Sequence, residues 1–312
     1  MTCTVFIQSN HRQLLGALVS AYSLRRNSSS PDSFDVRILN SEDFPFLAAR
    51  DGQEFLRDGR KHVWKYDDLQ SFTPLRFMPP ELMNYQGRAV VIDPDVFAVG
   101  DIAELFGRDM EGKAIFCRYR EGKGDRPGYF ASSVMLLDCA RLQHWQCQRN
   151  FEEMFSFERD YAKWIKLELE PRESIGLLEE EWNHFDTLTE KTKLLHNTKR
   201  PTQPWKTGLP IEYGNMAPRT HFGIPTGWTK FARHLFAGGD SPYGRYKKHP
   251  DPRQENLFFS LLREAMDEGV IGRDVVEAEV EKGHVRPDAL ALVKSAQYPG
   301  AAHVERSGAL AG

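Results

Sequence analysis

Two aspartates, Asp93 and Asp95, are separated by a single proline and follow residues 88–92, an arginine and four aliphatic residues. Two carboxylates one residue apart at the end of a buried strand are the hard oxygen ligands that Mg²⁺ or Mn²⁺ prefers. Pro94 fixes one φ angle and limits how far the carboxylates can separate. The same tripeptide is typical of a plain turn, in which an aspartate accepts hydrogen bonds from backbone amides. On the residues alone, the metal site and the turn stay equally open.

The elements around this tripeptide predict an α/β fold. A β-branched and aromatic run at 4–7 is followed by apolar residues at helical spacing over 14–24 and by a second strand at 34–39. This strand–helix–strand order predicts a mostly parallel sheet wound with helices, in which ligands bind beyond the carboxyl ends of the strands. Further strands are predicted at 62–66, 88–92, 114–118, 133–137 and 193–196, and further helices at 75–83, 101–106, 140–155 and 160–169.

The composition changes after about Gly208, where Pro, Gly, Thr and His dominate to about Pro252. We therefore expect a catalytic domain over 1–207, an extension over 208–298 and a flexible tail over 299–312. The extension contains an amphipathic helix predicted at 254–268, which ends before Gly269. We expect its apolar stripe to pack into the core, with a lipid or partner surface as the alternative.

Composition excludes several classes of partner. The 312 residues carry a formal net charge of −3, with 40% hydrophobic and 27% charged residues, as in an ordinary globular protein. That charge, without a basic stripe interleaved with aromatic residues, disfavours nucleic acid as a partner. We expect no signal peptide and no transmembrane segment, because no apolar run approaches the ~20 residues that a span needs.

The four cysteines form no CxxC pair, so we expect reduced thiols and a cytoplasmic location.

The stretch from Leu75 to Phe106 resembles the central block of GT-A fold glycosyltransferases and looks most like glycosyltransferase family 8, the glycogenin and lipopolysaccharide galactosyltransferase family. In that block a helix bearing an arginine precedes a strand that ends in D-x-D, and a G-D-[IL]-x-E-L-[FW] turn and helix follow. Four other segments resemble family motifs in the same order, so that the resemblance covers the first two-thirds of the chain: residues 6–9 with 15–18, 129–138, 181–183 and 194–205.

The resemblance implies a GT-A fold with a bound Mn²⁺ (or Mg²⁺) that contacts the diphosphate of a nucleotide-sugar. Residues matching the family's metal ligands are Asp93, Asp95 and His196. Imidazole and carboxylate ligands suit Mn²⁺. Residues matching the family's contacts with the nucleotide, the diphosphate or the sugar are Ile7, Gln8, Ser9, Asn10, Arg76, Pro94 and Trp205. From the residues alone, the loop at 7–10 could equally be an ordinary polar connection.

Two departures from the family pattern separate this chain from its better-known members. The family's N-[AS]-G is replaced by Ala131, Ser132 and Ser133, and the two serines are our candidates for the asparagine's role. The closing motif carries Gln203 where the family has lysine, so Lys199 or Lys206 is the candidate cation for the diphosphate. Asp160 resembles an acceptor-side aspartate of the family, although its place before a helix also fits an N-cap.

The resemblance implies transfer of a hexose from a uridine diphosphate sugar to a hydroxyl group of a glycan or other acceptor, with retention at the anomeric carbon. One alternative is a non-catalytic GT-A scaffold that binds a nucleotide or a glycan. The other is a nucleotidyltransferase, although residues 8–11 lack the glycine-rich, basic phosphate loop of that class. The sequence does not assign a sugar, and a homo-oligomer stays open.

Overall fold

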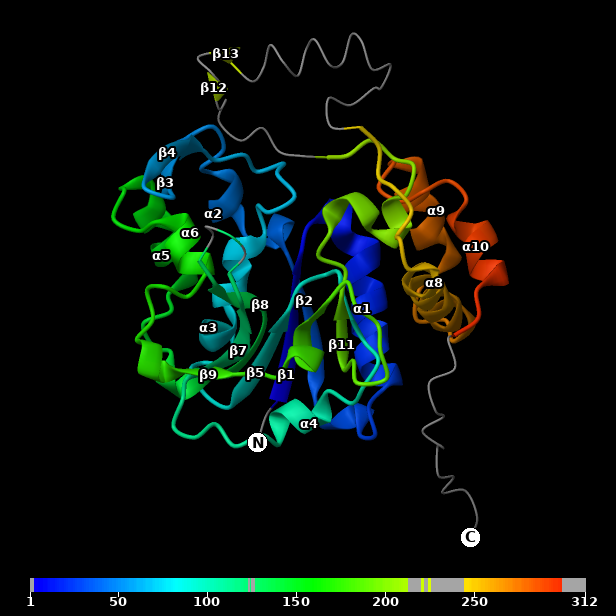
Figure 1. Cartoon of the computed structure of the whole chain (residues 1–312), viewed down its shortest axis with the longest axis horizontal. Coiled ribbons are helices and arrows are strands. Elements are labelled where there is room, and N and C mark those ends of the chain that lie inside the picture. Colours follow the sequence, from blue (N-terminus) through cyan, green and yellow to red (C-terminus); the bar gives the residue numbers. More distant parts are fainter. Residues whose placement is uncertain are drawn as a thin grey trace.

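A six-stranded sheet forms the centre of the protein (Figure 1). The structure is a computed structural model, and it describes residues 3–122, 124, 127–212, 220–221, 224–225 and 244–298. In spatial order the strands are β2 (Asp35–Asn40), β1 (Cys3–Ser9), β5 (Arg88–Ile92), β8 (Tyr129–Asp138), β7 (Ile115–Arg120) and β9 (Ile175–Leu177). Strand β8 is antiparallel to both of its neighbours, and every other pairing in the sheet is parallel. The mixed, mostly parallel sheet predicted from the sequence is therefore confirmed.

Helices cover both faces of this sheet, and smaller sheets lie beside it. The described helices are α1 (Leu14–Arg26), α2 (Pro45–Ala48), α3 (Pro79–Leu82), α4 (Ala103–Phe106), α5 (Cys147–Phe155), α6 (Tyr161–Ile165), α8 (Pro252–Asp267), α9 (Arg273–Glu281) and α10 (Ala289–Ser295). The remaining strands are β3 (Glu54–Arg57), β4 (Arg60–Val63), β6 (Val96–Ala98), β10 (His184–Phe185), β11 (Leu194–His196), β12 (Thr220–His221) and β13 (Ile224–Pro225). Within the described ranges, no helix has the length and apolar character that crossing a bilayer would need.

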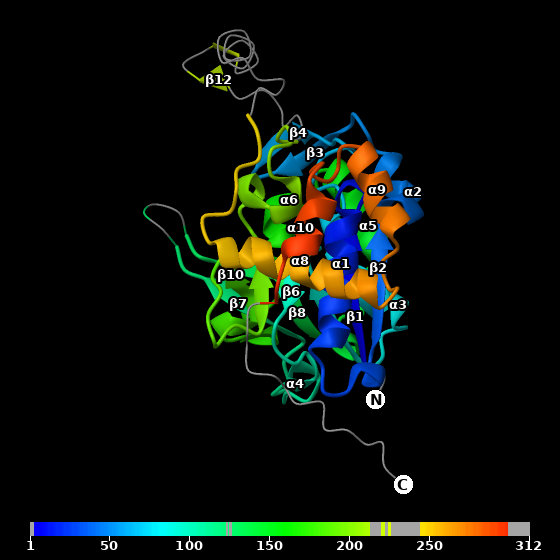
Figure 2. The same cartoon turned by 90° about the vertical axis from the view of Figure 1, so that its right-hand side faces the viewer.

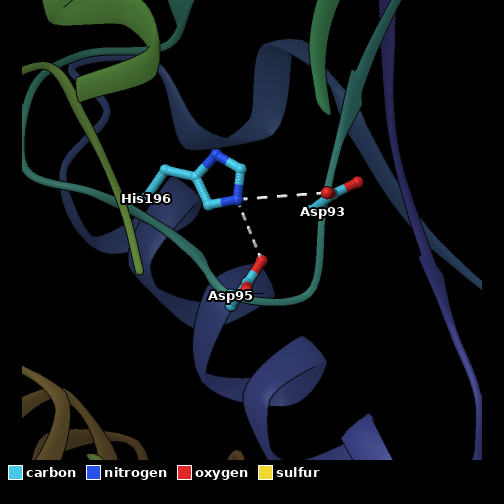
Figure 3. A group of neighbouring side chains, drawn as sticks. All are labelled: Asp93, Asp95 and His196. Carbon is cyan, nitrogen blue, oxygen red and sulfur yellow. Dashed lines mark ion pairs between the residues drawn. The ribbon is translucent and has the colours of Figure 1, made fainter. Parts of the chain in front are cut away.

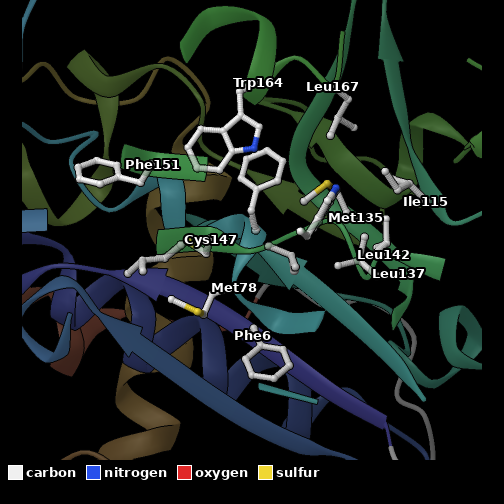
Figure 4. Close-up of a cluster of buried hydrophobic side chains, with 14 of the residues drawn as sticks. Phe6, Met78, Ile115, Met135, Leu137, Leu142, Cys147, Phe151, Trp164 and Leu167 are labelled. Atoms are coloured by element: carbon white, nitrogen blue, oxygen red, sulfur yellow. The ribbon is translucent and has the colours of Figure 1, made fainter. Parts of the chain in front are cut away.

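Side chains alternate between the two faces of the central sheet, as the two-residue period of a strand requires. Phe6 of β1 and Val91 of β5 point into a core cluster with residues of α5 and α6, among them Phe151 and Trp164 (Figure 4). Their neighbours along the same strands point to the opposite face, where they pack against α1. Because the strands are buried on both faces, they read in the sequence as continuous apolar runs.

Helix α1 lies between the sheet and the C-terminal helices (Figures 1 and 2). Its outer face contributes Leu15 and Val19 to a third core cluster, which contains the apolar stripe of α8 and residues of α9 and α10. Arg26 and Glu264 add an ion pair between α1 and α8, with N···O of 2.5 Å. The apolar stripe of α8 thus packs inward. The predicted tail at 299–312 lies outside the described residues.

Several predicted elements differ from those observed. The strand expected at 62–66 is β4, which pairs only with β3 in a two-stranded hairpin and does not join the central sheet. Its exposed Arg60 and Lys61 suit an edge hairpin better than a buried strand. The helix expected at 140–155 is shorter, because a 3₁₀ turn occupies Cys139–Arg141 and the α-helix begins at Cys147.

Helix α1 approaches the backbone of the Asp93–Asp95 turn at Gly16. A Cβ atom at this position would lie 2.8 Å from the carbonyl oxygen of Pro94 and 3.1 Å from Cζ2 of Trp205. The Pro94 carbonyl belongs to the backbone and cannot rotate away, so glycine is needed here for close approach.

We predict that Gly16→Ala lowers the free energy of unfolding by about 1–3 kcal/mol, the usual cost of overpacking. Alanine in an unobstructed helix position would instead stabilise by up to ~1 kcal/mol. Chemical denaturation measures the difference. Gly107→Ala is the control, because a Cβ there meets its nearest atoms at an ordinary 3.8 Å. A Gly16→Ala variant as stable as the parent would contradict the close approach.

Candidate metal centre and ligand cavity

Asp93 and Asp95 lie at the carboxyl end of β5, next to the ends of the neighbouring strands. The β5–β8 ladder continues one step beyond the strand, since the Asp93 N–H donates to the Ser133 carbonyl at 3.0 Å. On the other side, Ile92 pairs with Ile7 of β1, which brings Gln8 beside Asp93. The backbone of the first aspartate is therefore fixed by the central sheet.

His196 reaches the two aspartates through the small sheet β10–β11–β6. Strand β6 begins at Val96, directly after the turn, and β11 pairs with it antiparallel so that His196 lies opposite Val96. The Asn197 N–H extends this ladder by donating to the Asp95 carbonyl at 3.0 Å. A residue about a hundred positions away in the sequence is thus held beside the turn by strand register.

The three side chains converge on one point (Figure 3). One ligand atom from each of Asp93, Asp95 and His196 lies within 4.8 Å of the other two. His196 Nε2 is 3.3 Å from Asp95 Oδ1 and 3.9 Å from Asp93 Oδ2. Asp95 Oδ1 is buried and accepts no hydrogen bond from the part of the chain that the structure describes. An orphaned carboxylate oxygen facing an imidazole nitrogen, with a second carboxylate beside them, fits a divalent ion with oxygen and nitrogen ligands.

The negative charge of Asp93 is balanced mainly by Arg76, which lies in the 3₁₀ helix Thr73–Phe77. Arg76 Nε donates to Asp93 Oδ1 at 2.9 Å, and Arg76 Nη2 pairs with Asp93 Oδ2. Gln8 Nε2 also donates to Asp93 Oδ1. Burial raises the pKa of Asp93, and the charges of Arg76 and His196 oppose that shift. This carboxylate therefore has its charge partner within the protein.

Asp95 is balanced differently. Its Oδ2 accepts a hydrogen bond from Gln203 Nε2 at 3.1 Å, and Gln203 is neutral. Burial would raise the pKa of Asp95, but the attraction of His196 and the hydrogen bond from Gln203 outweigh it and lower the pKa. Asp95 therefore stays ionised and is the more available of the two carboxylates for a cation.

Asn183 orients the imidazole; the sequence placed it in a segment that resembles a family motif but did not predict it as a site residue. His196 Nδ1 lies 2.8 Å from Asn183 Oδ1, while Asn183 Nδ2 donates to Ser133 Oγ at 3.0 Å. The amide oxygen can only accept, so Nδ1 carries a proton and Nε2 is the ring nitrogen that faces the aspartates. Such partners of a metal-binding histidine fix its tautomer and ring orientation.

The three residues form part of the wall of a cavity of about 410 Å³, a size typical of small-molecule sites. The predicted site residues that line it are Arg76, Asp93, Pro94, Asp95, Ser132, Ser133 and His196. Described residues that also line it are Gln13, Leu69, Gln70, Phe72, Thr73, Arg120, Tyr129, Ala131, Ile165, Lys166, Phe185, Thr198 and Gln203. Ser132 links two of the walls, since its Oγ accepts from Arg76 Nη1 at 3.0 Å and donates to the Ile165 carbonyl.

Residues 7–10, expected to form a loop, lie behind the wall in the structure: Ile7, Gln8 and Ser9 are the last residues of β1, and none of the four is in the described lining of the cavity. Ile7 is in the core, and Gln8 Nε2 donates to Asp93. Ser9 Oγ donates to the Asn10 carbonyl, and Asn10 Oδ1 accepts from the Arg12 N–H.

The closing segment also contributes less to the cavity than expected. Lys206 is 1% exposed, and its Nζ pairs with Glu212 at 2.7 Å. Trp205 stacks on Phe258 of α8 with a centroid distance of 4.9 Å. Neither residue is in the described lining, and Lys199 is not either. Burial of the tryptophan in the third core cluster draws this segment toward α8 and away from the cavity.

Asp160 caps helix α6 and holds the β3–β4 turn. Its carboxylate accepts from the N–H groups of Ala162, Lys163, Asp58 and Gly59 at 2.7–3.2 Å. Partial burial would raise the pKa of Asp160, but these N–H donors outweigh it and hold the pKa below its ordinary value. Among the described residues, those lining the cavity do not include Asp160.

Comparisons with known proteins add structures of similar fold but low identity. No protein-family profile and no curated protein matches the chain. The glycosyltransferase GlyE of Streptococcus pneumoniae is 16% identical over 66% of this chain and 56% of its own, with a TM-score of 0.46. The bifunctional glycosyltransferase WbbM is 13% identical over 66% of this chain and 47% of its own, with a TM-score of 0.48. The galactosyltransferase LgtC is 14% identical over 65% and 89%, with a TM-score of 0.45. The chain spans about half the length of the first two proteins, and similarity at this level assigns no activity.

We predict that Asn183→Leu weakens Mn²⁺ binding by roughly tenfold to a hundredfold, because the imidazole loses the partner that fixes its tautomer. Calorimetric titration of the purified chain with Mn²⁺ measures the change. Asn150→Leu is the matched control, since Asn150 is also buried and hydrogen-bonded but lies on α5. Equal Mn²⁺ affinity in the Asn183 variant and the parent would show that this asparagine does not position a metal ligand.

We predict that Asp160→Ala lowers the free energy of unfolding at neutral pH by about 1–3 kcal/mol, because the helix cap and the bonds to the β3–β4 turn are lost. The native pKa is depressed, so this contribution is complete above the ordinary aspartate pKa and disappears as the pH falls through the native value. The difference in the free energy of unfolding between variant and parent should therefore become smaller in strong acid, as measured by denaturation at several pH values. The exposed Asp43→Ala serves as control. A gap that does not depend on pH would contradict the cap.

Proposed function

We propose that this chain is a GT-A glycosyltransferase, a divergent relative of glycosyltransferase family 8, that transfers a hexose from a uridine diphosphate sugar to a hydroxyl acceptor. The observation that carries the proposal is the convergence of Asp93, Asp95 and His196 in the wall of a 410 Å³ cavity at the carboxyl end of β5. Open α/β sheets bind ligands at this edge. The donor set suits Mn²⁺ or Mg²⁺ and matches the ligands that the sequence resemblance implies.

In this proposal the metal ligands are Asp95 and His196, with Asp93 completing the set. A bound divalent ion supplies a Lewis acid that stabilises negative charge on the leaving diphosphate. The protein keeps its own ligands ready for that role. Gln203 holds one oxygen of Asp95, and Asn183 holds the tautomer of His196. Both ligands are thereby fixed before the donor binds, which reduces the reorganisation needed during transfer.

The cavity also supports retention without a covalent sugar intermediate. Among the described lining residues, Asp93 and Asp95 are the carboxylates, and both belong to the candidate metal centre. The Ser132 hydroxyl donates to the Ile165 carbonyl, and the Ser133 hydroxyl accepts a hydrogen bond from Asn183 Nδ2. Front-face transfer fits this arrangement, because it needs the donor and the acceptor hydroxyl to be held together and needs no nucleophile from the protein.

The nucleotide is placed near the connection from β1 to α1, as the resemblance implies. In the described part of this connection, Gln13 lines the cavity, and its buried Oε1 makes no hydrogen bond with the residues that the structure describes. An acceptor atom of this kind is suited to an N–H or O–H group of the base or the ribose.

The test is donor hydrolysis by the purified chain with a panel of nucleotide-sugars, with and without Mn²⁺. We predict that release of the nucleoside diphosphate requires the metal and falls roughly a hundredfold or more in Asp95→Asn. Asp43→Asn, an exposed change of the same chemistry, should keep parental activity.

Three other outcomes would be decisive. Full activity in both Asp93→Asn and Asp95→Asn would disprove the metal assignment. Thermal stabilisation by uridine nucleotides and Mn²⁺ without any hydrolysis would favour a non-catalytic binding scaffold. Transfer of a nucleotidyl group instead of a sugar would favour a nucleotidyltransferase.

A further inference from the structure

One positively charged side chain in the wall of the cavity has no acidic partner among the described residues. The positively charged side chains that line it are Arg76, Arg120 and Lys166. Arg76 directs Nε and Nη2 to Asp93 and Nη1 to Ser132, so all three of its nitrogens are engaged. Lys166 Nζ lies 3.9 Å from a carboxylate oxygen of Asp58 and 3.9 Å from one of Glu168. These two cations already have acidic partners.

Arg120 differs from both. It ends β7, and its Nη1 donates to the neutral Tyr129 hydroxyl at 3.1 Å. Its guanidinium lies 5.0 Å from the centre of the Phe185 ring. Within the part of the chain that the structure describes, no carboxylate lies within ion-pair distance of it. The aromatic face holds the guanidinium in place without neutralising it.

Phe185 connects Arg120 to the candidate metal centre. Its ring also packs against the imidazole of His196, with a centroid distance of 5.5 Å. One aromatic side chain therefore contacts both the histidine and the arginine, which sets Arg120 on the side of the cavity where the metal ligands lie.

We propose that Arg120 binds the diphosphate group of the nucleotide-sugar, in the role that the resemblance would give to a lysine of the closing segment. This inference rests on the proposed function. The lysines of that segment are not placed to bind the diphosphate, since Lys206 is paired with Glu212 and Lys199 is outside the described lining of the cavity. A planar guanidinium can donate two parallel hydrogen bonds to phosphate oxygens.

The charges of the cavity support this assignment. The Asp93 carboxylate and the Arg76 guanidinium cancel each other. Asp95 with a divalent ion would leave one positive charge, and Arg120 adds a second. Together they balance the two negative charges of a nucleoside diphosphate ester. Without Arg120, one phosphate charge would stay uncompensated in a half-enclosed cavity, which is costly.

The test is calorimetric titration of the full chain with uridine diphosphate in the presence of Mn²⁺. We expect Arg120→Ala to weaken binding roughly tenfold to a hundredfold and Arg120→Lys to give an intermediate loss, because lysine keeps the charge without the paired geometry. Inorganic pyrophosphate should lose affinity by a similar factor. Mn²⁺ titrated alone should bind both variants as it binds the parent.

Arg172→Ala is the matched control and should bind uridine diphosphate within about twofold of the parent, an effect too small to indicate a lost ionic contact. Arg172 also lies over a phenylalanine, 4.9 Å from the Phe130 ring centre, and does not line the cavity as described. Parental affinity in Arg120→Ala would overturn the inference, and so would an equal loss of Mn²⁺ affinity, which would reveal an effect through the metal site. If the parent binds neither uridine, guanosine nor adenosine diphosphate nor pyrophosphate, the proposed function fails together with the inference.

Discussion

Burial of two carboxylates at the end of one strand is the constraint on which the rest of the site depends. A buried charge needs a partner, and the two aspartates, only one residue apart, find theirs in different parts of the chain. Asp93 is met by Arg76 and Gln8, from segments that precede β5. Asp95 is met by His196 and Gln203, from segments that follow the sheet. The turn is therefore the point at which the two halves of the site meet.

The small sheet β10–β11–β6 positions His196 beside the two aspartates. Strand β6 leaves the turn at once, and its antiparallel partner β11 places His196 opposite Val96. A slip of one residue would point the imidazole to the other face. Hydrogen bonds to α8 oppose such a slip. Asn197 Nδ2 donates to Gln254 Oε1 of α8 at 2.6 Å, and Gln254 Nε2 donates to the Asp186 carbonyl at 2.9 Å. Packing of the C-terminal helices and alignment of the metal ligands are thus linked.

Local pattern was sufficient for β5 and the turn that follows it, but not for the residues that contact the two aspartates. The apolar run before Asp93 predicts a buried strand, because burial on both faces leaves a continuous hydrophobic stretch. His196 was found only because its position matched a family motif. Asn183 lies in a segment that resembles a family motif but was given no role in the site, and Arg120 carries no local signal, since an arginine at a strand end occurs in many settings. Their positions depend on which strand ends lie together, and that follows from long-range pairing.

In the closing segment, the sequence instead predicted two residues at the cavity that the structure places elsewhere. Its resemblance predicted a cation and a tryptophan at the cavity, yet Lys206 is buried with Glu212 and Trp205 packs on Phe258. Gln203 explains how the site tolerates this. A lysine in its place would form an ion pair with Asp95 and reduce the negative charge available to a metal ion, whereas the neutral amide only orients the carboxylate. With that charge left free for a metal ion, our proposal assigns the positive charge for the diphosphate to a separate residue, Arg120, whose guanidinium lies 5.0 Å from the centre of the Phe185 ring.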